Sequence, residues 1–184
     1  MQLLVIHGSS RKEGNTKDLT KVVLNSLEQD QYQELDLLDY NIQPIIDERH
    51  TEFGFTPVAD DYETVIKELL QAQTILFVTP LYWFAMSGRL KNFIDRFSQS
   101  LRNADYDFKE QIKGKKAYVL VVGGEKAPLT ALPLIQQFQL IFQFLGIEFA
   151  GYCIGKGVKP QEVLQSAESI TAAKFLGDKI KADL

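Results

Sequence analysis

The chain has 184 residues, of which 45% are hydrophobic and 24% are charged, a composition typical of an ordinary globular domain. Its 20 basic and 24 acidic residues are mixed along the sequence and leave a net charge of −4, so no surface for nucleic acid or for a membrane is predicted. The apolar runs are too short to span a bilayer, and a single cysteine, Cys153, excludes an intramolecular disulfide and a zinc site built from cysteines. We expect one domain over residues 1–184, located in the cytoplasm because the first residues lack the pattern of a secretory signal.

The first half of the chain alternates predicted strands with predicted helices. Its hydrophobic pattern predicts, in order, a strand over 2–7, a helix over 16–28, a strand over 32–38, a helix that begins behind Asp60 or Asp61, and a strand over 73–79. Either Asn15 or Thr16 can cap the first helix. Residues 39–60 show no period, and such a long loop is either functional or mobile.

The second half continues the alternation. The pattern predicts a helix from Leu90 to Leu101, an irregular polar stretch over 102–114, a strand over 118–122, a helix over 131–145, a strand over 147–154 and a last helix opened by Pro160. The helix over 131–145 is apolar on nearly every side, which is more than a helix lying on a sheet requires. We therefore expect a homodimer, or a higher assembly, that buries its free face.

Five predicted strands alternating with helices indicate an α/β fold, a doubly wound parallel sheet with helices on both faces. Ligands of such sheets bind beyond the carboxyl ends of the strands, where the strand order reverses. In the order 2-1-3-4-5, the loops after the first, third and fourth strands meet in one crevice. These loops, 8–16, 80–88 and 123–128, carry the unusual chemistry of the chain, so we expect the functional site there.

The first of these loops is suited to an anion. It follows a buried strand and opens a helix, so its N–H groups and the helix dipole both point at a negative group bound there. Hydroxyl, amide and guanidinium donors add to them, and a glycine lets the backbone approach: Ser9, Ser10, Arg11, Gly14, Asn15 and Thr16. The alternative is a polar turn that merely caps the helix. The patterns of a P-loop and of a Gly-x-Gly-x-x-Gly loop are both missing, which argues against an NTPase and a Rossmann dinucleotide site.

The second loop carries three consecutive aromatic residues, Tyr82, Trp83 and Phe84. They cannot all face one core, so at least one of them lines a cavity or a protein interface. Ser87 can cap the helix that follows, alongside any other role.

The third loop contains Gly123 and Gly124, whose bare backbone can lie against a planar group and donate N–H bonds to it. A plain tight turn explains this pair equally well. Elsewhere Cys153 is expected to be a core thiol, and the acidic residues beside His50 are expected to be solvated rather than to hold a metal. No nucleophile or catalytic triad can be identified.

Together these segments resemble the NAD(P)H-dependent FMN reductases of the flavodoxin-like superfamily, which include quinone reductases. The likeness spans residues 2–154 and is carried by Gly8–Thr16, Pro80–Ser87, the run Leu90-Lys91-Asn92-Phe93-Ile94-Asp95-Arg96, and Gly123-Gly124. Within that superfamily the chain is most similar to the branch containing iron–sulfur flavoproteins. Those proteins carry a compact cysteine motif in the segment matching Pro44–Phe55, which has no cysteine in this chain, so an iron–sulfur cluster is excluded for want of thiolate ligands.

The resemblance implies a flavodoxin-like fold and an enzyme with FMN as cofactor and NAD(P)H as co-substrate. It implies that hydride passes to flavin N5 and then to a small acceptor (a flavin, quinone, azo or nitro compound) by ping-pong, without a catalytic side chain or a metal. The cofactor-binding residues it implies are Ser9, Ser10, Arg11, Gly14, Asn15 and Thr16 around the phosphate, Pro80, Leu81, Tyr82, Trp83 and Phe84 around the isoalloxazine ring, Gly123 and Gly124 at its pyrimidine edge, and Ser87 close by.

Two other functions stay open at this point. One is a flavodoxin-type electron carrier, and the other is a non-catalytic flavin-binding module in which residues 82–84 form a protein-binding patch. Carriers tend to be strongly acidic, so the net charge of only −4 and the presence of Arg11 in the first loop favour the enzyme. The segment 47–60 is a candidate lid for the site.

Overall fold

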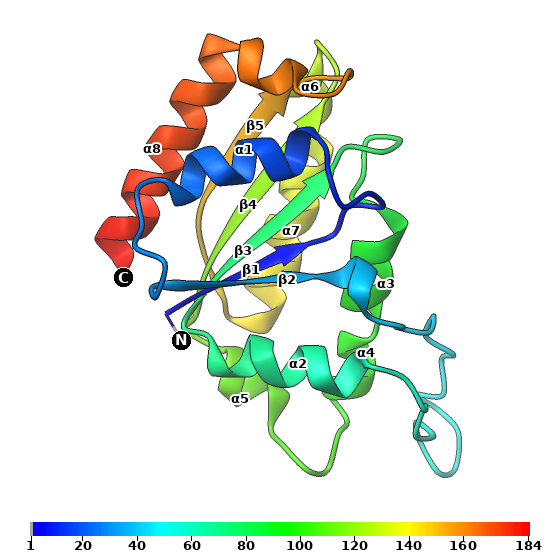
Figure 1. Cartoon of the computed structure of the whole chain (residues 1–184). Coiled ribbons are helices and arrows are strands. Elements are labelled where there is room, and N and C mark those ends of the chain that lie inside the picture. Colours follow the sequence, from blue (N-terminus) through cyan, green and yellow to red (C-terminus); the bar gives the residue numbers. More distant parts are fainter. Residues whose placement is uncertain (1) are drawn as a thin grey trace.

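The computed structural model describes residues 2–184 and contains a five-stranded parallel sheet with the order β2-β1-β3-β4-β5, as predicted (Figure 1). The strands are β1 (Leu3–His7), β2 (Tyr32–Asp36), β3 (Thr74–Pro80), β4 (Lys116–Gly123) and β5 (Glu148–Lys156). The order reverses between β1 and β3, which are hydrogen-bonded neighbours. The carboxyl ends of these two strands therefore flank the point at which such sheets bind ligands.

Helices cover both faces of the sheet (Figure 1). On one face α1 (Asn15–Leu24) packs beside α8 (Ala167–Asp183). The other face carries α2 (Tyr62–Gln71), α3 (Gly88–Asp95), α4 (Phe97–Ser100), α5 (Phe108–Ile112) and α7 (Leu132–Leu145), with the short α6 (Ala127–Thr130) before α7. No helix within residues 2–184 is both long enough and apolar enough to cross a membrane.

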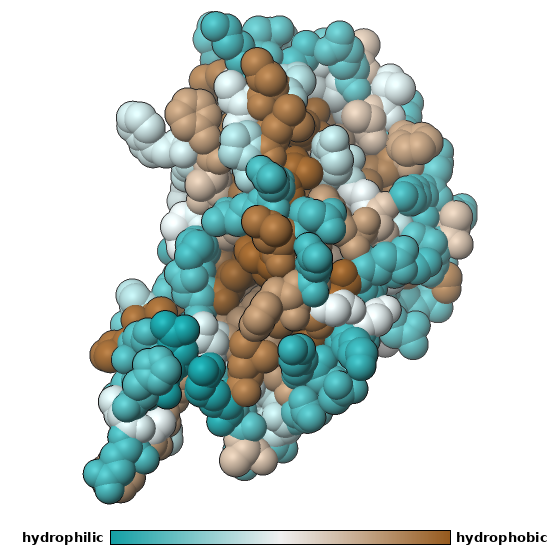
Figure 2. Space-filling view, turned by 180° about the vertical axis from the view of Figure 1, so that it is seen from behind, coloured by the Kyte–Doolittle hydropathy of each residue, from teal (hydrophilic) through white to brown (hydrophobic). Residues whose placement is uncertain are grey.

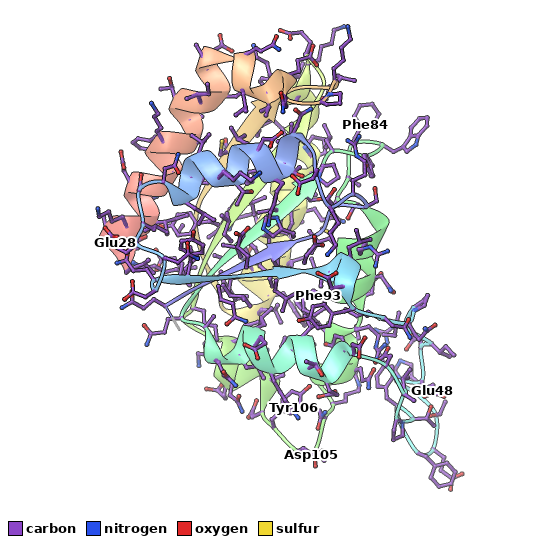
Figure 3. The ribbon with its side chains drawn as sticks, viewed as in Figure 1. Glu28, Glu48, Phe84, Phe93, Asp105 and Tyr106 are labelled. Atoms are coloured by element: carbon purple, nitrogen blue, oxygen red, sulfur yellow. The ribbon has the colours of Figure 1, made fainter. Side chains whose placement is uncertain are left out.

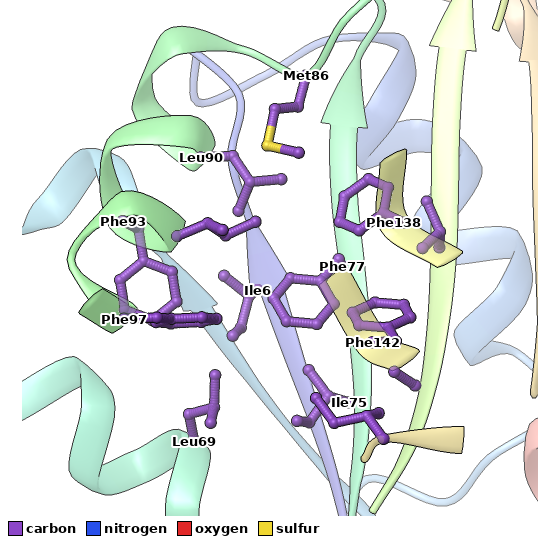
Figure 4. Close-up of a cluster of buried hydrophobic side chains, with 14 of the residues drawn as sticks. Ile6, Leu69, Ile75, Phe77, Met86, Leu90, Phe93, Phe97, Phe138 and Phe142 are labelled. Atoms are coloured by element: carbon purple, nitrogen blue, oxygen red, sulfur yellow. The ribbon is translucent and has the colours of Figure 1, made fainter. Parts of the chain in front are cut away.

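The strands contribute to two apolar clusters because successive side chains of a strand point to opposite faces. Val5 of β1 packs under α1 and α8, whereas its neighbour Ile6 packs on the other face. That second cluster is rich in aromatic rings (Figure 4), with the Phe77 ring centroid 5.8 Å from that of Phe138 and 5.6 Å from that of Phe142. Burial on both faces explains why β3 reads as an uninterrupted apolar run.

Three expectations about helices were wrong. The single helix expected from Leu90 to Leu101 is two, α3 and α4, which are separated at Arg96. The stretch 102–114, expected to be irregular, contains α5, which begins behind the side-chain cap of Asp107. The last helix does not begin at Pro160, because a 3₁₀ turn (Glu162–Gln165) comes first and α8 then begins behind the cap of Ser166. Elements of four or five residues are too short to display a helical period, which is why the pattern did not separate them.

After β2 and a 3₁₀ turn (Leu37–Asp39), an irregular segment projects from the body of the molecule before α2 (Figure 1). Its two ends are joined, because Asp61 N donates to Asn41 O at 2.9 Å and the Asp61 carboxylate accepts from Asn41 N at 2.8 Å. Asn92 of α3 also donates to Ile42 O at 2.7 Å. The segment is therefore a loop whose two ends are held by hydrogen bonds.

Candidate functional site

A cavity of about 260 Å³ opens at the carboxyl ends of β1, β3 and β4, beside the point where the strand order reverses. It is lined by Ser9, Arg11, Gly14, Asn15, Thr16, Pro80, Leu81, Tyr82, Val122, Gly123, Gly124, Gly157 and Val158. The three loops singled out by the sequence thus meet in one place. The predicted cofactor residues outside this lining are Ser10, Trp83, Phe84 and Ser87.

The first loop presents an uncapped helix N-terminus to this cavity. Helix α1 begins at Asn15 behind Gly14, and no side chain within residues 2–184 caps it, so the predicted cap by Asn15 or Thr16 was wrong. The first N–H groups of a helix have no partner inside the helix and favour an anion. Gly14 has φ 153° and ψ 179°, a region open essentially to glycine alone. The turn therefore leaves backbone donors, rather than a capping side chain, at the cavity.

Arg11 is the charged side chain of the lining. Its Nη2 atom lies 3.6 Å from where a Cβ on Gly14 would be, which places the guanidinium beside the turn. The next residue, Lys12, is held by Asp36 at 3.5 Å and by a hydrogen bond to Asp39 that raises the pKa of the Lys12 ammonium. Arg11 is thus the cation best placed to bind a phosphate in the cavity.

The polar side chains of the first loop differ in what they offer a ligand. Ser9 Oγ accepts a hydrogen bond from Arg11 N at 3.1 Å, which shapes the loop. Thr16 lines the cavity with 5% of its surface exposed. Asn15 lines it too, but its amide is bonded to the loop that follows β5 rather than to the first loop.

The second loop makes a tight turn with unusual residues at its tip. Tyr82 and Ala85 exchange two backbone hydrogen bonds of 3.0 Å, and Trp83 and Phe84 between them have φ 51° and 64°. These values describe a type I′ turn, which normally carries Asn and Gly. Trp83 is 94% exposed and Phe84 59%, and Figure 3 shows Phe84 on the loop beyond β3. Tyr82 lines the cavity, and its hydroxyl lies 3.1 Å from Ser10 Oγ, which joins the second loop to the first.

Ser87 is buried and acts in the framework around the cavity. Its Oγ accepts a hydrogen bond from Leu90 N at 3.1 Å, which confirms the predicted cap of α3. The same hydroxyl donates to Gly8 O, at the start of the first loop. Ser87 therefore fixes the first loop against α3.

The third loop meets a fourth that sequence reasoning missed. A Cβ on Gly123 would press against packed side chains at 3.0–3.1 Å, whereas Gly124 meets only Val158 Cγ2 at 3.6 Å. Gly157 N donates to Gly123 O at 2.8 Å, so the loop after β5 lies directly against the third loop. The glycines at the end of the fifth strand were the available signal for this contact.

A larger cavity, of about 860 Å³, lies between the 53–58 stretch of the projecting segment, α2 and the loop before α5. It shares no residue with the cavity at the switch point. Residues 47–60 do not line that smaller cavity, so the expected lid does not cover it within this chain. The smaller cavity is the candidate site, because the helix N-terminus, the guanidinium and the diglycine turn converge there.

The described part of the chain offers neither a group of metal ligands nor an exposed thiol. Within residues 2–184 no three His, Cys, Asp or Glu side chains are grouped so as to hold a metal ion. Cys153 is buried in β5, as predicted, and burial raises the pKa of its thiol to about 12. A thiol of this kind is unreactive at neutral pH.

Comparison with known proteins identifies the family. A family model described as NADPH-dependent FMN reductase matches residues 1–148. A putative NAD(P)H-dependent FMN-containing oxidoreductase of Bacillus subtilis is 45% identical over 177 residues, covering 96% of each chain. An iron–sulfur flavoprotein of Methanocaldococcus jannaschii is 27% identical over 192 residues, covering 98% of this chain and 95% of the relative. The chain therefore belongs to the NADPH-dependent FMN reductase family.

Solved structures agree on the fold. A Bacillus subtilis protein described as Trp repressor binding protein has a TM-score of 0.78 at 37% identity, covering 95% of this chain and 97% of the other. An FMN-dependent NADH-azoreductase of Bacillus anthracis, solved in complex with FMN, has a TM-score of 0.69 at 16% identity and covers 99% of both chains. The expected flavodoxin-like fold is thus confirmed.

Proposed function

We propose that the protein is an NAD(P)H-dependent FMN oxidoreductase that reduces a small planar acceptor such as a flavin, a quinone, an azo compound or a nitro compound. The main support is that an anion cradle, an aromatic side chain and a diglycine turn line one cavity in a member of this family. A relative from a Bacillus species, 30% identical over 132 residues, is described as an NADPH azoreductase. The acceptor class is proposed from the descriptions of such relatives.

The cavity suits the two ends of FMN. The free N–H groups at the start of α1, together with Arg11, offer a phosphate charge-assisted hydrogen bonds. To a flat ring in the ligand, Tyr82 offers an aromatic side chain and Gly124 offers bare backbone. FMN supplies the hydride chemistry when it is bound, so the chain itself needs no nucleophile.

The contribution of the protein is to orient rings and to stabilise charge. Backbone N–H groups after β4 would stabilise negative charge on a reduced ring, a contact worth about 2.7–4 kcal/mol in a buried oxyanion hole. Holding two rings in contact supplies near-attack geometry. We expect the nicotinamide and the acceptor to use the same open face in turn, which makes the kinetics ping-pong.

Turnover distinguishes this proposal from its rivals. The FMN-loaded protein should oxidise NADPH or NADH when free FMN, a quinone or an azo dye is supplied, with parallel double-reciprocal lines. If no acceptor supports oxidation of either nicotinamide, the protein is an electron carrier. If Trp83→Ala abolishes capture of a protein partner and leaves flavin reduction unaltered, it is a non-catalytic binding module.

We also propose a homodimer that buries the outer face of α7. Phe138 and Phe142 pack on the sheet, yet Leu140 is 60% exposed and Phe144 64%. Figure 2 shows hydrophobic side chains gathered in a band on the face behind the sheet, where α7 lies. Such a patch on a small domain typically marks a protein interface. Size-exclusion chromatography should give a dimer that Leu140→Glu with Phe144→Glu converts to a monomer, and a wild-type monomer at micromolar concentration would refute this.

The cytoplasm is the location we propose, because the nicotinamide substrate is made and recycled there.

A further inference from the structure

We propose that the loop after β5, residues 157–163, is a fourth wall of the flavin site and that Asn15 is the positioning residue that holds it in place. The inference rests on the proposed function, because the wall has a role only if a flavin binds in the cavity. It assigns a new task to Asn15, whose side chain would act on the cofactor through the loop and not by binding the phosphate.

Asn15 joins two points of this loop, Lys159 and Val163, to the start of α1. Its Nδ2 donates to Lys159 O at 2.9 Å, and its Oδ1 accepts a hydrogen bond from Val163 N at 3.3 Å. The residue is only 6% exposed, so both bonds are made away from bulk water. Both ends of the amide are engaged by the loop, which takes the carbonyl oxygen and one of the two N–H donors before any ligand arrives.

The loop packs closely against the start of α1 and against the third loop. A Cβ on Gly157 would lie 2.6 Å from Val163 N and 3.1 Å from Asn15 Cγ, so only glycine fits there. Gly157 N also donates to Gly123 O at 2.8 Å. The loop is thereby fastened at one side to the phosphate end of the cavity and at the other side to the diglycine end.

The inner structure of the loop presents one apolar side chain to the cavity. Glu162 Oε2 accepts hydrogen bonds from Val158 N at 2.6 Å and from Lys159 N at 2.9 Å, which closes the loop on itself. Val158 is 69% exposed, lines the cavity and lies next to Gly124. An exposed valine held rigidly at this point suits contact with an apolar ring, which would cover it.

The two parts of the cavity would then meet different parts of the ligand. The N-terminus of α1 and Arg11 would meet the phosphate, which FMN has and riboflavin lacks. The wall would meet the part that both flavins share. Substituting a residue that acts through the wall must therefore change the affinity for both flavins alike. Substituting a residue that binds the phosphate must change the affinity for FMN alone.

The test measures the Kd of FMN and of riboflavin by flavin fluorescence for the wild-type protein and four single variants. Asn15→Ala should weaken both flavins by the same factor, about 5- to 30-fold, because two backbone groups of the loop lose their partner. Arg11→Ala should weaken FMN and leave riboflavin unchanged. Val158→Ala should weaken both flavins by about three- to tenfold, while Leu164→Ala, which alters a half-exposed side chain outside the cavity lining, should change neither.

A double variant separates positioning from general damage. If Asn15 acts by holding the wall, Val158→Ala should cost little extra affinity in the Asn15→Ala background, so the two effects should not add. Additive effects, a loss confined to FMN in Asn15→Ala, or a wild-type Kd for both flavins in Val158→Ala would each overturn the proposal. If Asn15→Ala does not fold, the Val158 variant alone decides. Failure of the wild-type protein to bind either flavin would instead refute the proposed function, and this inference with it.

Discussion

The guanidinium of Arg96 and the carboxylate of Asp60 form an ion pair with 2.6 Å between Nη1 and Oδ2, and their side chains are only 2% and 1% exposed. Arg96 also donates to Gln43 O at 3.0 Å and lies 4.5 Å from the centre of the Tyr62 ring. Burial disfavours ionisation of Asp60, but the hydrogen bonds from Arg96 and from two backbone N–H groups outweigh it, and the pKa of the carboxyl is lowered. The junction between α3 and α4 thus holds the base of the projecting segment.

Breaking this pair should destabilise the protein strongly. Asp60→Asn leaves the Arg96 charge buried without a counter-charge, which we expect to lower the free energy of unfolding by about 3–5 kcal/mol. Urea denaturation followed by circular dichroism measures it. The control is Asp47→Asn, since Asp47 and Arg49 also pair at 2.6 Å in this segment but are 51% and 43% exposed. Removing the exposed pair should cost far less, because solvent screens the two charges, and equal losses would contradict the account of Asp60.

Ser87 should matter for stability and not for contact with the flavin. Ser87→Ala removes the cap of α3 and the bond to Gly8 O, so we expect the free energy of unfolding to fall by about 1–2 kcal/mol. The affinity of the folded variant for FMN should stay close to that of the wild type. A large loss of FMN affinity without a loss of stability would return Ser87 to the cofactor-binding residues.

The turn at Trp83 and Phe84 should store strain. Aromatic residues with φ 51° and 64° are disfavoured, and each such position costs on the order of 1–3 kcal/mol. Replacing the pair with Trp83→Asn and Phe84→Gly installs the preferred residues of a type I′ turn. We expect thermal stability to rise and turnover with NADPH to fall, because the exposed aromatic surface is lost. The control, Trp83→Ala, keeps a Cβ at positive φ and should bring no such gain; a double variant no more stable than this control would show that the turn is unstrained.

Acid should weaken the contact between β1, β2 and α1. Glu34 accepts hydrogen bonds from His7 Nε2 and Lys17 Nζ, both at 2.6 Å, and mainly the first of these lowers its pKa from 4.5 to about 2. A carboxyl with a lowered pKa stabilises the fold above its ordinary pKa, and this stabilisation is lost as the pH falls from about 4.5 towards 2. Allowing for the partial exposure of Glu34, we expect the wild type to lose about 1–2 kcal/mol more than Glu34→Gln over this interval. Urea titrations at several pH values test it, and parallel curves for the two proteins would contradict it.

The sheet, and the place where the loops after β1, β3 and β4 meet, could be predicted because both depend on local sequence patterns. Residues 75–78 of β3 are all apolar since both faces of the strand are covered, and the loops after β1, β3 and β4 carry glycine, hydroxyl and aromatic residues in short runs. The predicted strand order was enough to place those loops together, and no side-chain contact had to be known. The family resemblance rested on the same runs.

The remaining features depend on contacts between residues distant in sequence. Asn15 is of a residue type that can cap a helix or bind a phosphate. Only its bond to Lys159 O, 144 positions away, shows what its amide does. Asp60 was a plausible helix cap, yet its carboxylate reaches Arg96, 36 positions on. Val158 had no distinguishing neighbour in the sequence at all. Such roles arise from packing, which no local pattern encodes.

The central claim, that the cavity holds FMN for reduction by NAD(P)H, is tested most directly by titrating the flavin-free protein with FMN and then adding NADPH without oxygen. We predict that one FMN per chain binds, that it is released on denaturation, and that NADPH bleaches the flavin absorbance of the complex. A folded protein that binds no FMN, or whose bound FMN stays oxidised with both NADPH and NADH, would contradict the claim.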